Sequence, residues 1–256
     1  MKQYAGYIFD LDGTVYRGGK LIAGAGETLA RLRARGARVV FLSNNPTYTR
    51  EQYAAKLTRL GIPCGVAEVA NSSYAIIQEL KRDAPKARLY PVSEQAFIGE
   101  LRDAGFTFAR TPEETDIVVL AFDRTFHYGK WFFAHQALKR GAQLWATNPD
   151  RTCPTEDGDT PDCGSLIPAI ETSSGHKLDR MTGKPSAAIV RVASELLGVP
   201  IRQCLMVGDR LETDVKMGHN AGCDTAVVLT GITTREMLAT TEIRPDYVLE
   251  SIAELA

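Results

Sequence analysis

The sequence predicts an α/β fold in which a mostly parallel sheet is covered by helices on both faces. Short aliphatic and β-branched runs alternate with amphipathic segments along the chain, which is the order that β–α–β units produce. The amphipathic segments end at glycines, as helices commonly do. A chain of 256 residues is also long enough to bury a large core without disulfides.

Seven runs have the composition of buried strands. They lie at residues 7–9, 39–43, 116–122, 143–148, 204–209, 225–229 and 246–249. Three amphipathic segments, 25–35, 50–60 and 186–197, are predicted as helices. The glycine that follows each of them stands where a helix C-terminus needs positive φ.

Residues 148–164, NPDRTCPTEDGDTPDCG, are rich in proline, aspartate, glycine and threonine. This composition predicts a loop. Long loops inside compact domains are usually functional or disordered. Because the segment interrupts a series of strands and helices that could otherwise be continuous, it also suggests an inserted second domain.

The composition argues against several functional classes. Hydrophobic residues make up 44% of the chain, charged residues 24%, and the formal net charge is −1 without a basic run. We therefore expect no binding to nucleic acid or to membrane surfaces. No apolar stretch has the length of a membrane span, and the first acid comes too early for a signal peptide. Five scattered cysteines suit reduced thiols, so we expect a cytoplasmic protein.

Polar side chains stand where three of the predicted strands end. They are Asp10 and Asp12, Ser43 and Asn44, and Asp209 with Asp214 further along. Parallel sheets bind ligands at the carboxyl ends of their strands. Carboxylates brought together there repel one another unless a cation compensates, and hard oxygen ligands suit Mg²⁺ beside a phosphate. The pattern thus predicts a magnesium site next to a phosphate, for which Lys184, just before a predicted helix, supplies further positive charge.

These residues, in this order, resemble the motifs of the haloacid dehalogenase superfamily of phosphohydrolases. The motif DxDGT stands at residues 10–14, a strand ends in Ser43, Lys184 precedes a helix, and GDxxxTD stands at residues 208–214. The segments FDRTFHYGKWFFAHQAL, GAQLWATNPD and GDRLETDVKMGHNAGCDTAVVLTGITT are similar to the NagD-like branch. That branch includes 4-nitrophenylphosphatases, phosphoglycolate phosphatases, and nucleotide or sugar-phosphate phosphatases.

The resemblance implies a fold and a division of the chain. Residues 1–79 and 181–256 would form a Rossmann-like, doubly wound parallel-sheet core. Residues 80–180 would form an inserted α/β cap domain that determines substrate specificity. The implied activity is Mg²⁺-dependent hydrolysis of small phosphomonoesters, so the expected partner is a small phosphorylated metabolite.

The resemblance also implies roles for the acidic residues. Asp10 would be the nucleophile that forms an aspartyl-phosphate, and Asp12 the general acid and base. The Asp10 carboxylate, the Asp12 backbone carbonyl and Asp209 would hold the metal. Asp214 would orient a neighbour of the metal or Lys184.

The remaining implied contacts concern the substrate. Ser43, Asn44 and Lys184 would bind the phosphoryl oxygens. In the cap, Asn148 and Asp150 are candidate substrate contacts, as are Asp157 and Asp159 further along the same segment. Cys163 and Pro168 depart from the glycine-rich turn and small-residue helix that are usual there, so the usual substrates cannot be assumed for this chain.

Some alternatives stay open. The aspartyl-phosphate could pass to an acceptor other than water, which would make the protein a phosphotransferase or mutase. A regulatory protein that binds a phosphorylated ligand without turnover is a second alternative. The aromatic residues Trp131, Phe132 and Phe133 lie in a helical stretch, where they are either buried or part of a homodimer contact through the cap.

Overall fold

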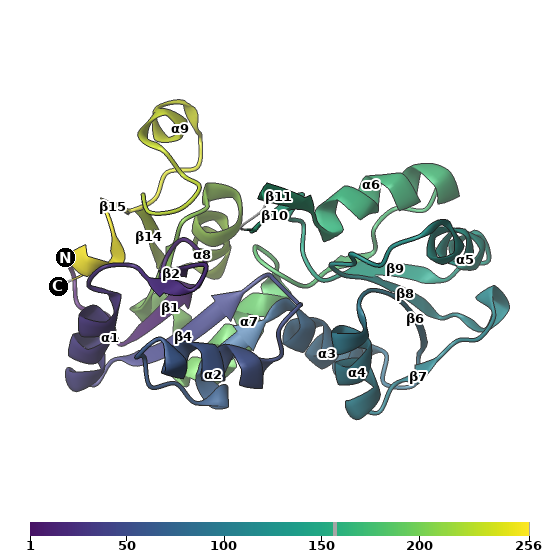
Figure 1. Ribbon diagram of the computed structural model, residues 1–256, viewed down its shortest axis with the longest axis horizontal. Helices are drawn as coiled ribbons and strands as arrows, with labels where there is room; N and C mark the ends of the chain where they lie inside the picture. The colour runs from purple at the N-terminus through teal and green to yellow at the C-terminus, as the bar shows by residue number, and fades with distance from the viewer. Residues whose placement is uncertain (156–157, 256) are drawn as a thin grey trace. The chain divides into compact units, whose positions relative to one another are not determined.

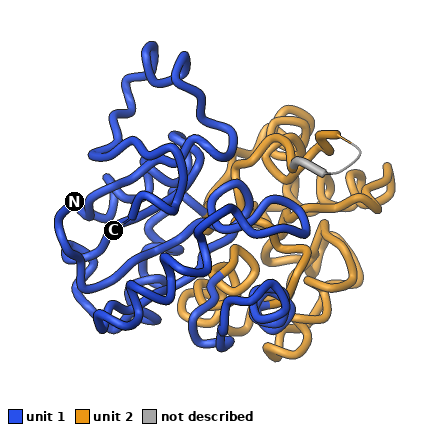
Figure 2. Tube along the Cα trace, turned by 60° about the vertical axis from the view of Figure 1, so that its left-hand side comes forward, with its two compact units in different colours: residues 1–43, 50–70, 184–256 blue, residues 44–49, 71–183 orange. Residues whose placement is uncertain are grey.

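The computed structural model describes residues 1–155 and 158–255. The chain forms two compact units, which Figure 2 shows in different colours. The first consists of Met1–Ser43, Arg50–Ala70 and Lys184–Ala256, and the second of Asn44–Thr49 and Asn71–Gly183. The predicted cap limits, 80 and 180, fall within the second unit, and its role as a cap stays a prediction.

A six-stranded sheet forms the centre of the first unit, with the order β15-β14-β13-β1-β4-β5. The strands are β1 (Gly6–Asp10), β4 (Arg38–Ser43), β5 (Val69–Asn71), β13 (Cys204–Gly208), β14 (Asp224–Val228) and β15 (Tyr247–Leu249). From β15 to β4, all neighbouring strands run parallel. The predicted parallel α/β core is therefore confirmed. A small antiparallel pair, β2 (Tyr16–Arg17) and β3 (Lys20–Leu21), follows β1.

Helices cover both faces of this sheet (Figure 1). They are α1 (Ala25–Ala34), α2 (Arg50–Arg59), α7 (Ala187–Leu197), α8 (Lys216–Ala221) and α9 (Arg235–Thr240). Phe9 and Phe41 pack with Leu29 of α1 and Leu57 of α2 in one hydrophobic cluster. Since strand side chains alternate between faces, Ile8 points the other way, to the side where α7 contacts β4 and α8 contacts β13. The sheet is thus doubly wound, as predicted.

The second unit contains a parallel sheet of its own, with the order β12-β9-β8-β6-β7. Its strands are β6 (Arg88–Val92), β7 (Thr107–Phe108), β8 (Ile117–Leu120), β9 (Gln143–Ala146) and β12 (Arg180–Met181). Its helices are α3 (Ser72–Asp83), α4 (Gln95–Asp103), α5 (Tyr128–Lys139) and α6 (Cys163–Ser174). Leu80 and Leu101 pack with Val119 on the face of α3 and α4. Leu138 and Ile170 pack with the opposite face, so this sheet is also covered on both sides (Figure 1).

The prediction that residues 148–164 form a loop is wrong for most of the segment. Strands β10 (Thr152–Thr155) and β11 (Gly158–Pro161) pair antiparallel, with Cys153 opposite Thr160. Both strands of a two-stranded sheet are edge strands, where a residue such as Pro161 can lack a backbone donor. A composition typical of turns is therefore compatible with a hairpin. Helix α6 starts directly afterwards, with the Asp162 side chain accepting the Cys163 N–H. Asp157 lies outside the described residues.

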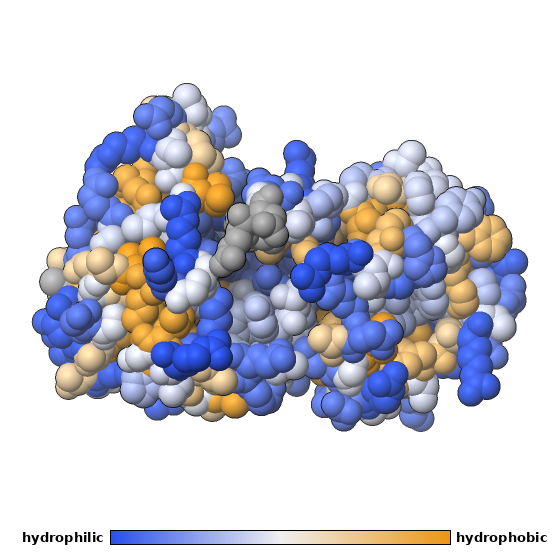
Figure 3. Space-filling view, viewed as in Figure 1, coloured by the Kyte–Doolittle hydropathy of each residue, from blue (hydrophilic) through white to orange (hydrophobic). Residues whose placement is uncertain are grey.

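Within the described ranges, 1–155 and 158–255, no helix has both the length and the apolar character needed to span a membrane. Figure 3 shows hydrophilic and hydrophobic residues intermixed over the visible face of the protein.

Candidate active site

Three neighbouring strands of the first unit deliver polar side chains to the same edge of its sheet. Asp10 is the last residue of β1, Ser43 is the last residue of β4, and Asp209 directly follows β13. Both β4 and β13 pair with β1 in parallel, and Asp10 is in register with Leu42, the residue before Ser43. The sheet alone therefore brings these residues together at the edge where parallel sheets bind ligands.

Lys184 supplies a buried cation to this edge. Its Nζ donates to Asp10 Oδ1 at 2.5 Å and to Asp214 Oδ1 at 2.6 Å. Only 2% of Lys184 is exposed. Burial by itself lowers the pKa of this amine, but the two carboxylates outweigh burial and raise the pKa above its ordinary value. Lys184 is therefore charged throughout the physiological range.

One lysine does not balance the acids around it. Asp10, Asp209 and Asp214 are all buried, and each offers a carboxylate oxygen within 4.8 Å of the others. Burial and, to a lesser degree, the charge of Asp214 raise the pKa of Asp209 to about 6. Burial and the same like charges raise the pKa of Asp10, against the lowering effect of Lys184. Three buried carboxylates with one ammonium leave excess negative charge, and this donor set suits a hard divalent cation.

Glycine residues pack directly against the Asp209 and Asp214 side chains. A Cβ on Gly13, whose φ is +87°, would lie 2.7 Å from Asp209 Oδ2. A Cβ on Gly231 would lie 2.5 Å from Asp209 Cβ and closer still to its carboxylate, and one on Gly208 would collide with Asp214. The neighbouring Ile232 N–H donates to Asp209 Oδ2 at 2.8 Å. The positions of these carboxylates are therefore fixed by backbone atoms that pack closely against them.

Asp12 differs from these buried acids because its side chain is exposed. It lies in the turn after β1, where the Gly13 N–H donates to the Tyr16 carbonyl at 2.8 Å. Partial burial raises the pKa of Asp12, while Lys56 and Arg17 lower it in part. An accessible carboxyl with a raised pKa is suited to proton transfer.

Of the two predicted phosphate-binding residues, Ser43 belongs to the first unit and Asn44 to the second. Ser43 ends β4 in the first unit, where its Oγ lies 3.1 Å from the Tyr53 hydroxyl. Asn44 belongs to the second unit, where its Nδ2 donates to Asp150 Oδ2 at 2.8 Å. The buried Asn148 side chain donates to the Asn44 carbonyl at 2.9 Å. The structure therefore gathers the predicted cap residues Asn148 and Asp150 around Asn44.

Comparisons with known proteins bear on what this arrangement does. A family model described as haloacid dehalogenase-like hydrolase matches residues 7–107, and a related HAD-hydrolase-like model matches residues 181–255. The sugar-phosphatase AraL of Bacillus subtilis (strain 168) is 38% identical over 253 residues, which cover 98% of this chain and 92% of the relative. The 5′-nucleotidase YutF of the same organism is 36% identical over 254 residues, covering 99% and 98%. A crystal structure of a 4-nitrophenylphosphatase from Thermotoga maritima matches with a TM-score of 0.93 at 36% identity, covering 99% of this chain and 96% of that one.

The chain belongs to the haloacid dehalogenase-like hydrolases. Its relatives include named phosphatases, and it is a phosphoric monoester hydrolase of the NagD-like branch, as the motifs indicated. Hydrolases of this family generally use a divalent metal, and the buried carboxylates of the first unit fit one.

Sequence reasoning missed part of the site of this hydrolase. Gly231 and the Ile232 N–H hold Asp209, and the Thr230 hydroxyl donates to the Gly13 carbonyl at 2.5 Å. All three residues follow β14, at the same sheet edge as Asp10. Their position after a predicted strand in a parallel sheet was the available signal, but none of them has a side chain that suggests catalysis.

Proposed function

We propose that this hydrolase cleaves small phosphomonoesters in a Mg²⁺-dependent reaction through an aspartyl-phosphate on Asp10. The observation that carries the proposal is the position of Asp10. It ends the central strand β1, bonds to the buried Lys184, and has two further carboxylates close by. A nucleophile needs such neighbours, because they stabilise the charge of an incoming phosphoryl group.

In the first half of the reaction, a carboxylate oxygen of Asp10 attacks phosphorus. A bond forms between Asp10 and phosphorus, and the bond from phosphorus to the ester oxygen breaks. Asp12 donates its proton to the departing oxygen, which leaves as an alcohol. The raised pKa of Asp12 supports this role because it keeps the acid protonated at higher pH.

The second half returns both residues to their starting states. Water attacks the phosphorus of the aspartyl-phosphate, and Asp12 accepts the proton of that water. The bond from phosphorus to Asp10 breaks, and inorganic phosphate leaves. Ser43, the backbone of Asn44 and Lys184 bind the phosphoryl oxygens throughout.

The Asp10 carboxylate, the Asp12 backbone carbonyl and Asp209 would hold Mg²⁺, and Asp214 fixes Lys184 beside them. When bound, the metal supplies positive charge that offsets the carboxylates and the phosphoryl oxygens. A purely oxygen donor set suits hard divalent ions, and one or two carboxylates beside a substrate phosphate are the ligands typical of Mg²⁺.

Substrate choice is assigned to the second unit. AraL is named for sugar phosphates and YutF for 5′-nucleotides, so relatives of similar identity act on different leaving groups. We infer that the second unit is the cap and that its residues near Asn44 contact the leaving group.

The test compares Asp10→Asn with Asp103→Asn, an exposed control in the second unit, using 4-nitrophenyl phosphate and Mg²⁺. Asp10→Asn should retain less than about a thousandth of the activity, chelation should abolish the activity of the unmodified protein, and the control should be unaffected. Full turnover by Asp10→Asn would sink the assignment. Products formed with an added acceptor alcohol separate hydrolysis, which releases only inorganic phosphate, from phosphotransfer.

The remaining proposals concern partners and location. Tyr128 and Phe132 of α5 are 76% and 53% exposed, whereas the Phe133 ring stacks on Tyr90 with centroids 3.7 Å apart. We propose that two copies pair through the exposed residues, so Phe132→Asp should lower the mass measured by sedimentation. Five widely scattered cysteines support a cytoplasmic location. The net charge of −1 supports the absence of nucleic-acid and membrane partners.

A further inference from the structure

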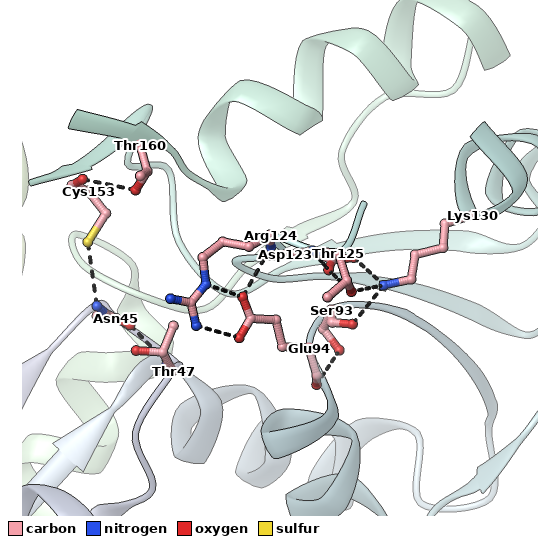
Figure 4. Close-up of polar contacts among 10 residues, drawn as sticks. All are labelled: Asn45, Thr47, Ser93, Glu94, Asp123, Arg124, Thr125, Lys130, Cys153 and Thr160. Carbon is pink, nitrogen blue, oxygen red and sulfur yellow. Dashed lines mark hydrogen bonds and ion pairs between the residues drawn. The ribbon is translucent and has the colours of Figure 1, made fainter. Parts of the chain in front are cut away.

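A group of polar side chains follows β6 and β8 in the second unit (Figure 4). The two strands are parallel neighbours with Val92 opposite Leu120, so the residues after them share one edge of the sheet. Glu94 follows β6, and Arg124 follows β8. None of the reaction steps above uses either residue.

Glu94 holds Arg124 in a two-pronged ion pair. Arg124 Nε donates to Glu94 Oε1 at 2.6 Å, and Nη2 donates to Oε2 at 2.8 Å. The Arg124 backbone N–H also donates to Oε1, at 3.1 Å. The Glu94 side chain is 18% exposed and that of Arg124 is 63% exposed. This geometry fixes the plane of the guanidinium while it leaves one face and one edge accessible.

The Nη1 nitrogen of Arg124 has no acceptor among residues 1–155 and 158–255. In Figure 4 this nitrogen is on the side of the guanidinium away from Glu94, toward Asn45 and Cys153. Two oriented N–H donors therefore point away from the ion pair that holds them.

The loop that carries Arg124 is fixed from its other side by Lys130. Lys130 Nζ donates to Asp123 Oδ2 at 2.6 Å, to Thr125 Oγ1 at 2.8 Å and to the Ser93 carbonyl at 3.0 Å. The Asp123 side chain is fully buried. Residues on both sides of Arg124 are thus held in place. The loop therefore loses less conformational entropy when a ligand binds.

The same unit places the loop 44–49 near Arg124. Asn45 Nδ2 donates to Cys153 Sγ at 3.5 Å, and Figure 4 shows Asn45 and Cys153 on the side of the Arg124 guanidinium away from Glu94. Asn45 follows Asn44, the proposed phosphate contact. The loop that neighbours Arg124 is therefore the one that carries the proposed phosphate contact.

The charges of this cluster favour hydroxyl groups over anions. Glu94 compensates Arg124 and Asp123 compensates Lys130, while Asp150 adds a negative charge beside Asn44. A hydroxyl can accept from Nη1 and donate to a carboxylate, whereas a second anionic group would be repelled by the charges of Glu94 and Asp150. The Tyr48 ring, 45% exposed, offers an apolar surface for sugar carbons.

We propose that Arg124, oriented by Glu94, is a specificity-determining residue that hydrogen-bonds hydroxyl groups of the leaving group, so that sugar phosphates are preferred over esters with aromatic or carboxylate leaving groups. This inference rests on the proposed phosphatase function.

The test measures kcat and KM for three probes: ribose 5-phosphate, 4-nitrophenyl phosphate, which has no hydroxyl on its leaving group, and phosphoglycolate, which has a carboxylate. Arg124→Met should lower kcat/KM for ribose 5-phosphate by about tenfold to a hundredfold, mainly through KM, and should change the value for 4-nitrophenyl phosphate by less than about twofold. Arg140→Met is the matched control, because Arg140 forms an exposed ion pair with Glu113 at 2.8 Å in the same unit.

Glu94→Gln provides a second, independent measurement. It removes the charge that compensates Arg124, so kcat/KM for phosphoglycolate should rise relative to that for ribose 5-phosphate. Thermal unfolding of each variant verifies that the fold is retained.

Equal losses for all three probes in Arg124→Met, or a larger loss for phosphoglycolate than for ribose 5-phosphate, overturn the inference. Hydrolysis of 4-nitrophenyl phosphate but of no sugar phosphate by the unmodified protein overturns it as well, while leaving the proposed function intact. Failure of the unmodified protein to hydrolyse any probe overturns the proposed function instead.

Discussion

The contact between Gly231 and Asp209 allows a sharp test of the proposed metal site. Gly231→Ala adds a single methyl group at a position where no positive φ is required. The backbone can therefore accept alanine, and the effect is purely steric. The added Cβ would lie 2.5 Å from Asp209 Cβ, about 1 Å inside the ~3.5 Å at which carbon atoms ordinarily touch.

The clash must displace either the loop after β14 or Asp209 itself. Asp209 is 3% exposed and cannot turn into solvent without leaving the site. Overpacking of this kind destabilises by about 1–3 kcal/mol. A displacement of ~1 Å at a reacting centre can lower the rate by about a hundredfold. We therefore expect Gly231→Ala to fold with reduced stability, to lose about a hundredfold in kcat/KM, and to need more Mg²⁺ for half-maximal activity.

The assay is hydrolysis of 4-nitrophenyl phosphate across a series of Mg²⁺ concentrations, together with urea unfolding. Gly99→Ala in α4 is the control, because nothing lies within 4 Å of its added Cβ. Removing a glycine from a helix interior should stabilise by roughly 0.5–1 kcal/mol and leave activity unchanged. If Gly231→Ala kept the kcat/KM and the Mg²⁺ requirement of the unmodified protein, the argument that this backbone positions Asp209 would be refuted.

Three further predictions concern charged residues. Lys184→Met should destabilise the protein by about 3–5 kcal/mol, measured by urea unfolding, because it leaves buried carboxylates without their cation; a change below about 1 kcal/mol would contradict the buried ion pairs. Asp12→Asn should lower kcat for ribose 5-phosphate by about a hundredfold to ten-thousandfold, and less for 4-nitrophenyl phosphate, whose leaving group needs little protonation; equal losses would argue against an acid role. The hydrogen bonds from Arg124 lower the pKa of Glu94 in the folded protein. They therefore add about 0.5–1 kcal/mol to the free energy of unfolding at pH values above the pKa of Glu94 in the unfolded chain. This contribution is lost as the pH falls through the pKa of Glu94 in the folded protein. The stability difference between the unmodified protein and Glu94→Gln should thus vanish in acid, and a difference that persists there would exclude this linkage.

Much of the first unit could be predicted because its strands and site residues are marked by short, local sequence patterns. The runs that form β1, β4 and β13 are short and apolar, and each meets a polar residue where it ends. Asp10, Ser43 and Asp209 therefore stand out before any contact is known. Parallel pairing of β1 with its two neighbours then suffices to bring them to one edge.

Features that depend on distant contacts could not be predicted. Strand β6 contains Pro91, which argues against a strand inside a sheet. In the structure β7 pairs only with Arg88 and Leu89, so Pro91 lies beyond the end of β7 and loses no backbone hydrogen bond on that side. The approach of Gly231 to Asp209 is also invisible in the sequence, because it depends on how the loop after β14 folds back.

The position of β1 in the middle of its sheet has a consequence for the order in which the protein folds during synthesis. Gly6 pairs with Arg38 on one side and with Cys204 on the other. The first pairing is available early, whereas the second must wait until Cys204 has been made and has left the ribosome. The sheet of the second unit, from Arg88 to Met181, is complete before Cys204 is made. The nascent chain therefore carries an unpaired edge of β1 while the later unit finishes folding, and that edge is a site where misfolding or chaperone binding can occur.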